Sequence, residues 1–221
     1  MSNTTPGGLL HLAAAAGAHL ESRRTGRFRP KPTARPAAVL ILFGPARDED
    51  TRGLEELTAD DLDVVLEVRS GALRAHAGEV AFPGGGAEPE DADIVATALR
   101  EANEEIGVDA ADVDILAQLP EVGTVSDFRV TPVIGWRKAP QHYVSVDEGE
   151  TADVLRVSVA WLLDPANRFT SVYRHPLGAF HGPAWDLNGV VLWGFTAFLL
   201  NDLFDAAGWS IPWDESRTRD L

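Results

Sequence analysis

A single mixed α/β domain is the fold class that the sequence predicts, and three observations support it. Strand-like apolar runs lie both before and after one amphipathic helix, and a second, strongly apolar helix comes late in the chain. The 221 residues are 45% hydrophobic, enough to fill one core without disulfides, and the chain has no cysteine. Strands on both sides of a central helix are typical of layered α/β domains.

The first 36 residues are predicted to form an N-terminal extension of the domain. Residues 1–8 read as irregular, and Leu9–Arg23 (LLHLAAAAGAHLESR) is compatible with a short alanine-rich helix. Residues 24–36 are basic and rich in proline, which favours an irregular connector. The domain is therefore expected at residues 37–207, with a C-terminal tail at 208–221.

Each element of the domain follows from its pattern. Apolar runs and partial alternation predict strands at 37–43, 62–69, 113–119, 129–136 and 153–159. Residues 92–106 have apolar side chains at helical spacing, and Gly107 stands where a helix would stop. A short helical turn is expected at 161–165 and a strongly apolar helix at 190–205. The apolar residues of that late helix lie on more than one face, which core burial and a homodimer contact explain equally well.

Charge and composition exclude several functions. The formal net charge is -15 with a sequence pI near 4.7, so the average surface repels DNA and RNA, and a phosphorylated small molecule would need local positive charge. The absence of cysteine excludes zinc–thiolate sites and cysteine nucleophiles. No apolar run is long enough to span a membrane, and no basic region precedes the early apolar segment, so we expect a cytoplasmic protein with no membrane partner.

Three carboxylates on the central helix are the first candidate site. Glu101, Glu104 and Glu105 occupy positions i, i+3 and i+4, which lie on one face, so we expect them to reach a common point. Their mutual repulsion would weaken the helix unless a cation lies among them. Oxygen ligands of this kind suit Mg²⁺ or Mn²⁺, and the neighbouring Arg100 can hold a carboxylate or meet a phosphate.

A glycine-rich segment precedes this helix. Gly84, Gly85 and Gly86 would let the backbone approach a phosphate closely, so they are candidate substrate-binding residues. An ordinary solvated acidic helix face would not need such a segment.

These residues resemble the Nudix box, G-x5-E-x7-R-E-U-x-E-E-x-G-U, in which U is a bulky apolar residue. The part in register comprises Arg100, Glu101, Glu104, Glu105, Gly107 and Val108. The first half departs from the pattern: counting strictly gives Gly86 with Ala92 in place of the first glutamate, whereas aligning on the double glycine gives Gly85 and Asp91 with one extra residue. Ala102 is also small for its apolar position. The resemblance implies a Nudix fold, with a mixed sheet between helices in α/β/α layers, and a hydrolase that needs Mg²⁺ or Mn²⁺.

A second motif is similar to the signature of coenzyme A pyrophosphatases, L-L-T-x-R-S-x3-R-x3-G-x3-F-P-G-G. The residues in register are Arg69, Ser70, Arg74, Gly78, Phe82, Pro83, Gly84 and Gly85. Glu67 replaces the threonine and Val65 the first leucine. Arg69, Ser70 and Arg74 are therefore candidate substrate-binding residues, and the two arginines would supply the positive charge that the surface lacks.

The resemblance implies that water attacks one phosphorus of coenzyme A or a derivative, giving 3',5'-ADP and 4'-phosphopantetheine or its acyl form. Glu101, Glu104 and Glu105 would hold the metal, and Glu104, Glu105 or Glu150 would take the proton. Two other readings stay open. A Nudix enzyme acting on ADP-ribose or NADH would keep the box without needing the upstream signature, and a non-catalytic Nudix ligand-binding module has little reason to keep three repelling glutamates.

Overall fold

The computed structural model describes residues 8–23, 29–72, 78–137, 141–147, 149–175 and 178–221. Its larger sheet has the strand order β3-β2-β1-β7-β5, with β4 paired to β1, β6 to β7 and β8 to β2. The bounds are β1 (Arg35–Pro45), β2 (Leu62–Arg69), β3 (Val80–Ala81), β4 (Gly84–Gly86), β5 (Val113–Gln118), β6 (Val122–Gly123), β7 (Phe128–Arg137) and β8 (Thr151–Ser158). The sheet is mixed, because β1 and β7 pair in parallel and β1 and β2 pair antiparallel.

Strand β1 is buried on both faces and therefore carries an almost unbroken apolar run. Alternate side chains point to opposite faces of a strand. Leu40 and Leu42 accordingly belong to the core under helix α2 (Ile94–Ile106), whereas Ile41 and Phe43 belong to the core on the other face.

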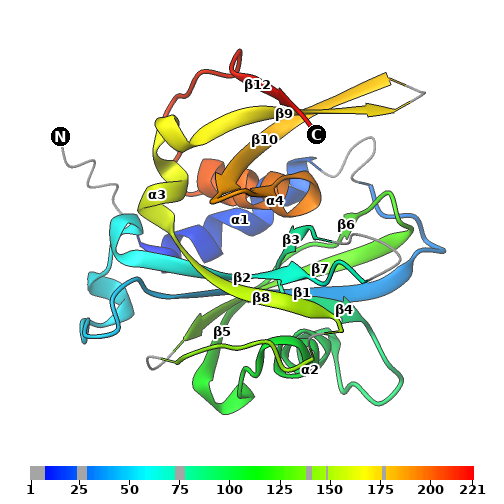
Figure 1. Cartoon of the computed structure of the whole chain (residues 1–221). Helices are drawn as coiled ribbons and strands as arrows, with labels where there is room; N and C mark the ends of the chain where they lie inside the picture. Colours follow the sequence, from blue (N-terminus) through cyan, green and yellow to red (C-terminus); the bar gives the residue numbers. More distant parts are fainter. Residues whose placement is uncertain (1–7, 24–28, 73–77, 138–140, 148, 176–177) are drawn as a thin grey trace.

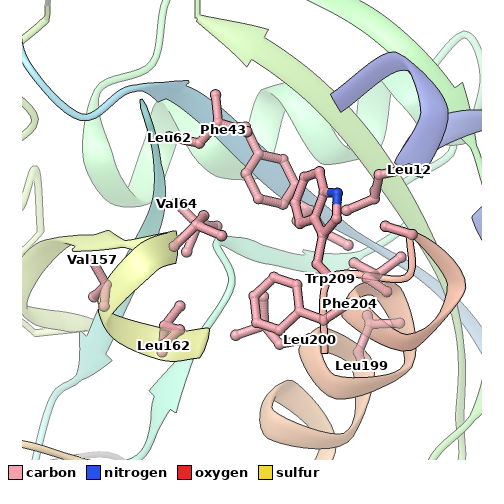
Figure 2. Close-up of a cluster of buried hydrophobic side chains, with 14 of the residues drawn as sticks. Leu12, Phe43, Leu62, Val64, Val157, Leu162, Leu199, Leu200, Phe204 and Trp209 are labelled. Carbon is pink, nitrogen blue, oxygen red and sulfur yellow. The ribbon is translucent and has the colours of Figure 1, made fainter. Parts of the chain in front are cut away.

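The second face is covered by helices α1 (Leu9–Arg23) and α4 (Gly194–Ala206), which lie between the two sheets (Figure 1). Figure 2 shows Trp209 and Phe204 packed with Leu12 and Phe43 in this core. Helices on both faces of a mixed sheet confirm the predicted α/β/α layers.

A second, smaller sheet was not expected from the sequence. It contains β9 (Arg168–His175), β10 (Gly178–Leu187), β11 (Val190–Leu192) and β12 (Thr218–Asp220) in the order β11-β10-β9-β12. The helix predicted at 190–205 is correspondingly shorter, because residues 190–192 pair with β10 and the helix begins at Gly194. The expected helical turn near 161–165 is α3 (Val159–Leu163), followed by a 3-10 turn.

The N-terminal and C-terminal segments contribute to the same core as the predicted domain. Leu9, Leu12 and Leu20 of α1 are buried, as is Trp209, which follows α4. Strand β12 near the end of the chain pairs in parallel with β9. Within the described residues, no helix is both long enough and apolar enough to cross a membrane.

Candidate active site

Helix α2 presents the predicted acidic residues, and its ends are defined by local chemistry. The Asp93 side chain accepts a 2.8 Å hydrogen bond from Ala96 N and caps the first turn. Gly107 ends the helix at φ 72°, a left-handed conformation that favours glycine. The apolar side of α2 packs on the sheet through Ala98, Ala102 and Ile106.

The three carboxylates of α2 lie in different surroundings. Glu105 is buried against the sheet, Glu101 is partly buried, and 56% of the Glu104 side chain is exposed. Among the described residues, no three acidic or histidine side chains lie close enough to form a preformed metal site. Each carboxylate is held by other partners, and the expectation that all three reach one point stays a prediction.

Two arginines are those partners. Arg100 Nη1 lies 3.0 Å from Glu101 Oε1 and 3.0 Å from Glu104 Oε2. Arg69 Nη1 lies 3.5 Å from Glu105 Oε1 and 3.1 Å from Glu67 Oε1. Each guanidinium nitrogen thus occupies a position between two carboxylates, where a cation is electrostatically favoured. Carboxylate oxygens are also the kind of ligand that a hard divalent ion prefers.

Arg100 also decides between the two alignments of the glycine-rich segment. Its Nε donates to Asp91 Oδ1 at 2.9 Å and its Nη2 donates to Asp91 Oδ2 at 3.2 Å, whereas Ala92 is exposed. Arg100 and the Glu88 and Thr97 donors hold the pKa of Asp91 far below its ordinary value. The contacts favour the alignment on Gly85 and Asp91, in which Asp91 anchors the arginine of the box.

The glycine-rich segment is a short strand rather than a loop. Gly84 to Gly86 pair with β1, and Gly84 N donates a 2.8 Å hydrogen bond to Glu105 Oε2. A Cβ on Gly85 would lie 2.5 Å from the Glu101 carboxylate, so a side chain at position 85 would displace the end of Glu101. Gly86 O accepts a hydrogen bond from Arg100 Nη2, and a Cβ on Gly86 would meet nothing within 4 Å. Of the three, Gly86 alone leaves open space for a ligand.

Burial and like charge shape the acidity of this centre. Burial, followed by the neighbouring Glu67, raises the pKa of Glu105 to about 8. Burial also raises the pKa of Glu101 and of Glu67, and the charge of Glu150 adds to both effects. Negative charge in a poorly hydrated site is the electrostatic condition that favours a bound cation.

The remaining predicted residues lie on or beside β2. Ser70 is buried, and its backbone N–H donates to Glu150 O at 2.7 Å, which places the exposed Glu150 beside the end of β2. Arg69 is one-quarter exposed and reaches the buried carboxylates from solvent. Arg74 lies outside the described residues.

Glu67 belongs to the candidate site but was not predicted as a site residue. The sequence analysis noted it only because it replaces the threonine of the signature. It is fully buried, and Thr151 Oγ1 donates a 2.6 Å hydrogen bond to its Oε2. The available signal was an acidic residue inside the apolar run LDVVLEVR, two positions before Arg69 and so on the same face of the strand.

Comparisons with known proteins agree on one family. The family model described as NUDIX domain matches residues 49–178, more than half of the chain. An uncharacterized Nudix hydrolase NudL from Citrobacter koseri is 36% identical over 142 residues, which cover 63% of this chain and 72% of that protein. A protein of the same description from Cronobacter sakazakii is 37% identical over the same shares. A solved structure of the Nudix hydrolase RenU from M. Smegmatis has 24% identity and a TM-score of 0.44, covering 59% of this chain and 74% of that one.

Proposed function

Because the chain belongs to the Nudix family and is a pyrophosphohydrolase of that family, we propose that its substrate is coenzyme A or a derivative. The products would be 3',5'-ADP and 4'-phosphopantetheine or its acyl form. The reaction adds water across one P–O–P link: the water oxygen bonds to one phosphorus, and the bridging oxygen leaves with the other phosphoryl group.

One observation carries this proposal. Arg69, from the segment similar to the coenzyme A pyrophosphatase signature, lies 3.5 Å from Glu105 of the Nudix box. Two residues 36 positions apart in the sequence, one from each motif, therefore meet at one site. An arginine beside the reacting link can bind a phosphate of the substrate, and coenzyme A offers a 3'-phosphate in addition to its pyrophosphate.

The metal ligands in this proposal are Glu101, Glu104 and Glu105, with Mg²⁺ or Mn²⁺ as the ion. A divalent ion supplies neutralisation of the phosphate charge and a lowered pKa of bound water. Arg100 would be released from Glu101 and Glu104 on metal binding but would keep its bonds to Asp91, so it stays in place for a phosphate oxygen.

Proton transfer falls to a carboxylate that can reach water. Glu105 accepts a hydrogen bond from Gly84 N and is buried, whereas Glu104 and Glu150 are exposed. Glu104 and Glu150 are therefore the preferred candidates for the general base. Replacing each by glutamine would separate them, because loss of the base lowers kcat far more than it changes KM.

The test is a product analysis with four substrates. Purified protein is incubated with coenzyme A, ADP-ribose, NADH or a nucleoside triphosphate, each with Mg²⁺ or Mn²⁺, and products are separated by chromatography. Glu104→Gln is the inactive comparison, and Glu55→Gln, an exposed acidic residue on the 3-10 turn before β2, is the matched control. Release of 3',5'-ADP from coenzyme A, lost only in Glu104→Gln, is the expected result.

Two further outcomes have definite meanings. Faster turnover of ADP-ribose or NADH would keep the Nudix chemistry and overturn the coenzyme A assignment. If coenzyme A is the substrate, dephospho-coenzyme A separates the roles of Arg69: a phosphate contact at the 3' position predicts that Arg69→Ala slows coenzyme A but not dephospho-coenzyme A.

A further inference from the structure

Glu67 is an uncommon choice at its position in the fold. It is fully buried in β2, where an unpaired charge is costly. The signature that this segment resembles has a threonine there, which is uncharged and too short to reach across two residues of a strand. A buried acid that departs from this pattern beside the candidate active site calls for a specific partner.

Both carboxylate oxygens of Glu67 have a hydrogen-bond partner. Oε1 accepts from Arg69 Nη1 at 3.1 Å, and Oε2 accepts from Thr151 Oγ1 at 2.6 Å. Thr151 lies on the adjacent strand β8, and the pairing of β2 with β8 shifts register between Val68 and Arg69, opposite Thr151. Such irregularities re-aim side chains, and this one lies where Arg69 leaves the sheet and turns toward α2.

Arg69 thus has two carboxyl partners through one nitrogen, Glu67 on its own strand and Glu105 on α2. Under the proposed function, Glu105 becomes a ligand of the metal ion, and Arg69 loses that partner. Glu67 cannot turn to the metal ion as Glu105 does, because Glu67 is buried and hydrogen-bonded to Thr151. It is the anion that remains to hold the guanidinium.

We propose that Glu67 is a positioning residue, which keeps Arg69 beside the metal-binding carboxylates so that its remaining donors meet a phosphate of the substrate. The inference rests on the proposed function and extends it. A threonine at position 67 would leave Arg69 with no fixed partner once Glu105 is engaged.

The test compares Glu67→Thr, Glu67→Gln, Arg69→Ala and the double variant Glu67→Thr/Arg69→Ala. With the substrate that the wild-type protein hydrolyses fastest, Glu67→Thr is expected to raise KM about tenfold with little change in kcat, as for the loss of a charge-assisted contact. Glu67→Gln keeps a neutral acceptor for Arg69 and should have a smaller effect. Glu55→Gln is again the exposed control.

The decisive result is the double-mutant cycle. If Glu67 acts through Arg69, adding Glu67→Thr to Arg69→Ala leaves KM unchanged. If Glu67 only supports the fold, the Glu67→Thr substitution raises KM by the same factor in the wild-type protein and in the Arg69→Ala variant, and the proposal is overturned.

A second cycle needs neither substrate nor metal. The same four variants are unfolded with urea in chelator, and the coupling between positions 67 and 69 is taken from the free energies of unfolding. If the wild-type protein hydrolyses no substrate, the proposed function fails, and this cycle alone tests the role of Glu67. A clear coupling energy would support the claim that Glu67 fixes Arg69, and additive effects would refute that claim.

Discussion

Replacing Glu105 by glutamine should make the metal-free protein more stable while abolishing its metal response. The side chain is buried, with only 4% exposed, and its pKa is raised from an ordinary 4.5 to about 8. Unfolded protein releases this proton near pH 4.5, whereas folded protein retains it until about pH 8. Between these values the folded state binds more protons, so wild-type stability falls as the pH rises.

The magnitude follows from the same interval. A difference between 4.5 and about 8 corresponds to roughly 5 kcal/mol. Side-chain relaxation and water entry reduce the cost of a buried charge, so we expect Glu105→Gln to gain about 2–3 kcal/mol at pH 8. Glutamine keeps an oxygen for the Gly84 N–H, so the gain is not offset by an unpaired donor.

Urea unfolding in chelator, followed by tryptophan fluorescence, measures this effect. The series runs from about pH 6, above the sequence pI near 4.7, to about pH 8.5. The difference between variant and wild type should grow with pH. Excess Mg²⁺ should stabilise the wild type and leave the variant unchanged. A difference that is constant or that shrinks toward high pH would refute the assignment of a raised pKa to Glu105.

Three further variants test the surrounding structure. Gly85→Ala places a Cβ 2.5 Å from the Glu101 carboxylate, so Mn²⁺ affinity measured by calorimetry should fall about tenfold with little loss of stability; unchanged affinity would separate Glu101 from the metal site. Asp91→Ala removes the two bonds to Arg100 and should cost about 1–2 kcal/mol in urea unfolding, with Asp91→Asn milder; equal losses would show that the charge of Asp91 is unimportant. Gly107→Ala forces a side chain into φ 72° and should cost about 1 kcal/mol by thermal unfolding, and an unchanged midpoint would contradict the left-handed C-cap.

Periodic segments of the sequence predicted their elements closely. The strand at 62–69 has the observed bounds, and the central helix differs from its prediction only at its start, because Asp93 is the cap. Residues 168–175 and 178–187 have no clear strand pattern, since proline, glycine and charged residues interrupt their alternation, yet they form the paired strands β9 and β10. The short run at 190–192 is compatible with strand or helix until its partner strand is known.

The sequence predicts candidate residues for the site but not their arrangement. Helical spacing places Glu101, Glu104 and Glu105 on one side of α2, yet the direction of each carboxylate depends on Arg69 and Arg100. Arg69 lies on another element, so helical periodicity carries no information about its contact with Glu105. The same holds for Glu67, whose partner Thr151 is 84 positions away in the sequence.

The packing of α1 against α4 has a consequence for synthesis of the chain. His19 of α1 lies 4.0 Å from Asp202 of α4, and Leu12 shares a core with Phe204. A ribosome therefore releases the first helix long before the helix that covers it. The side of α1 that packs on α4 stays uncovered until α4 has been made, and the core between the sheets can close only then. Deleting α1 would leave the core between the sheets exposed to water, so variants that lack α1 should aggregate.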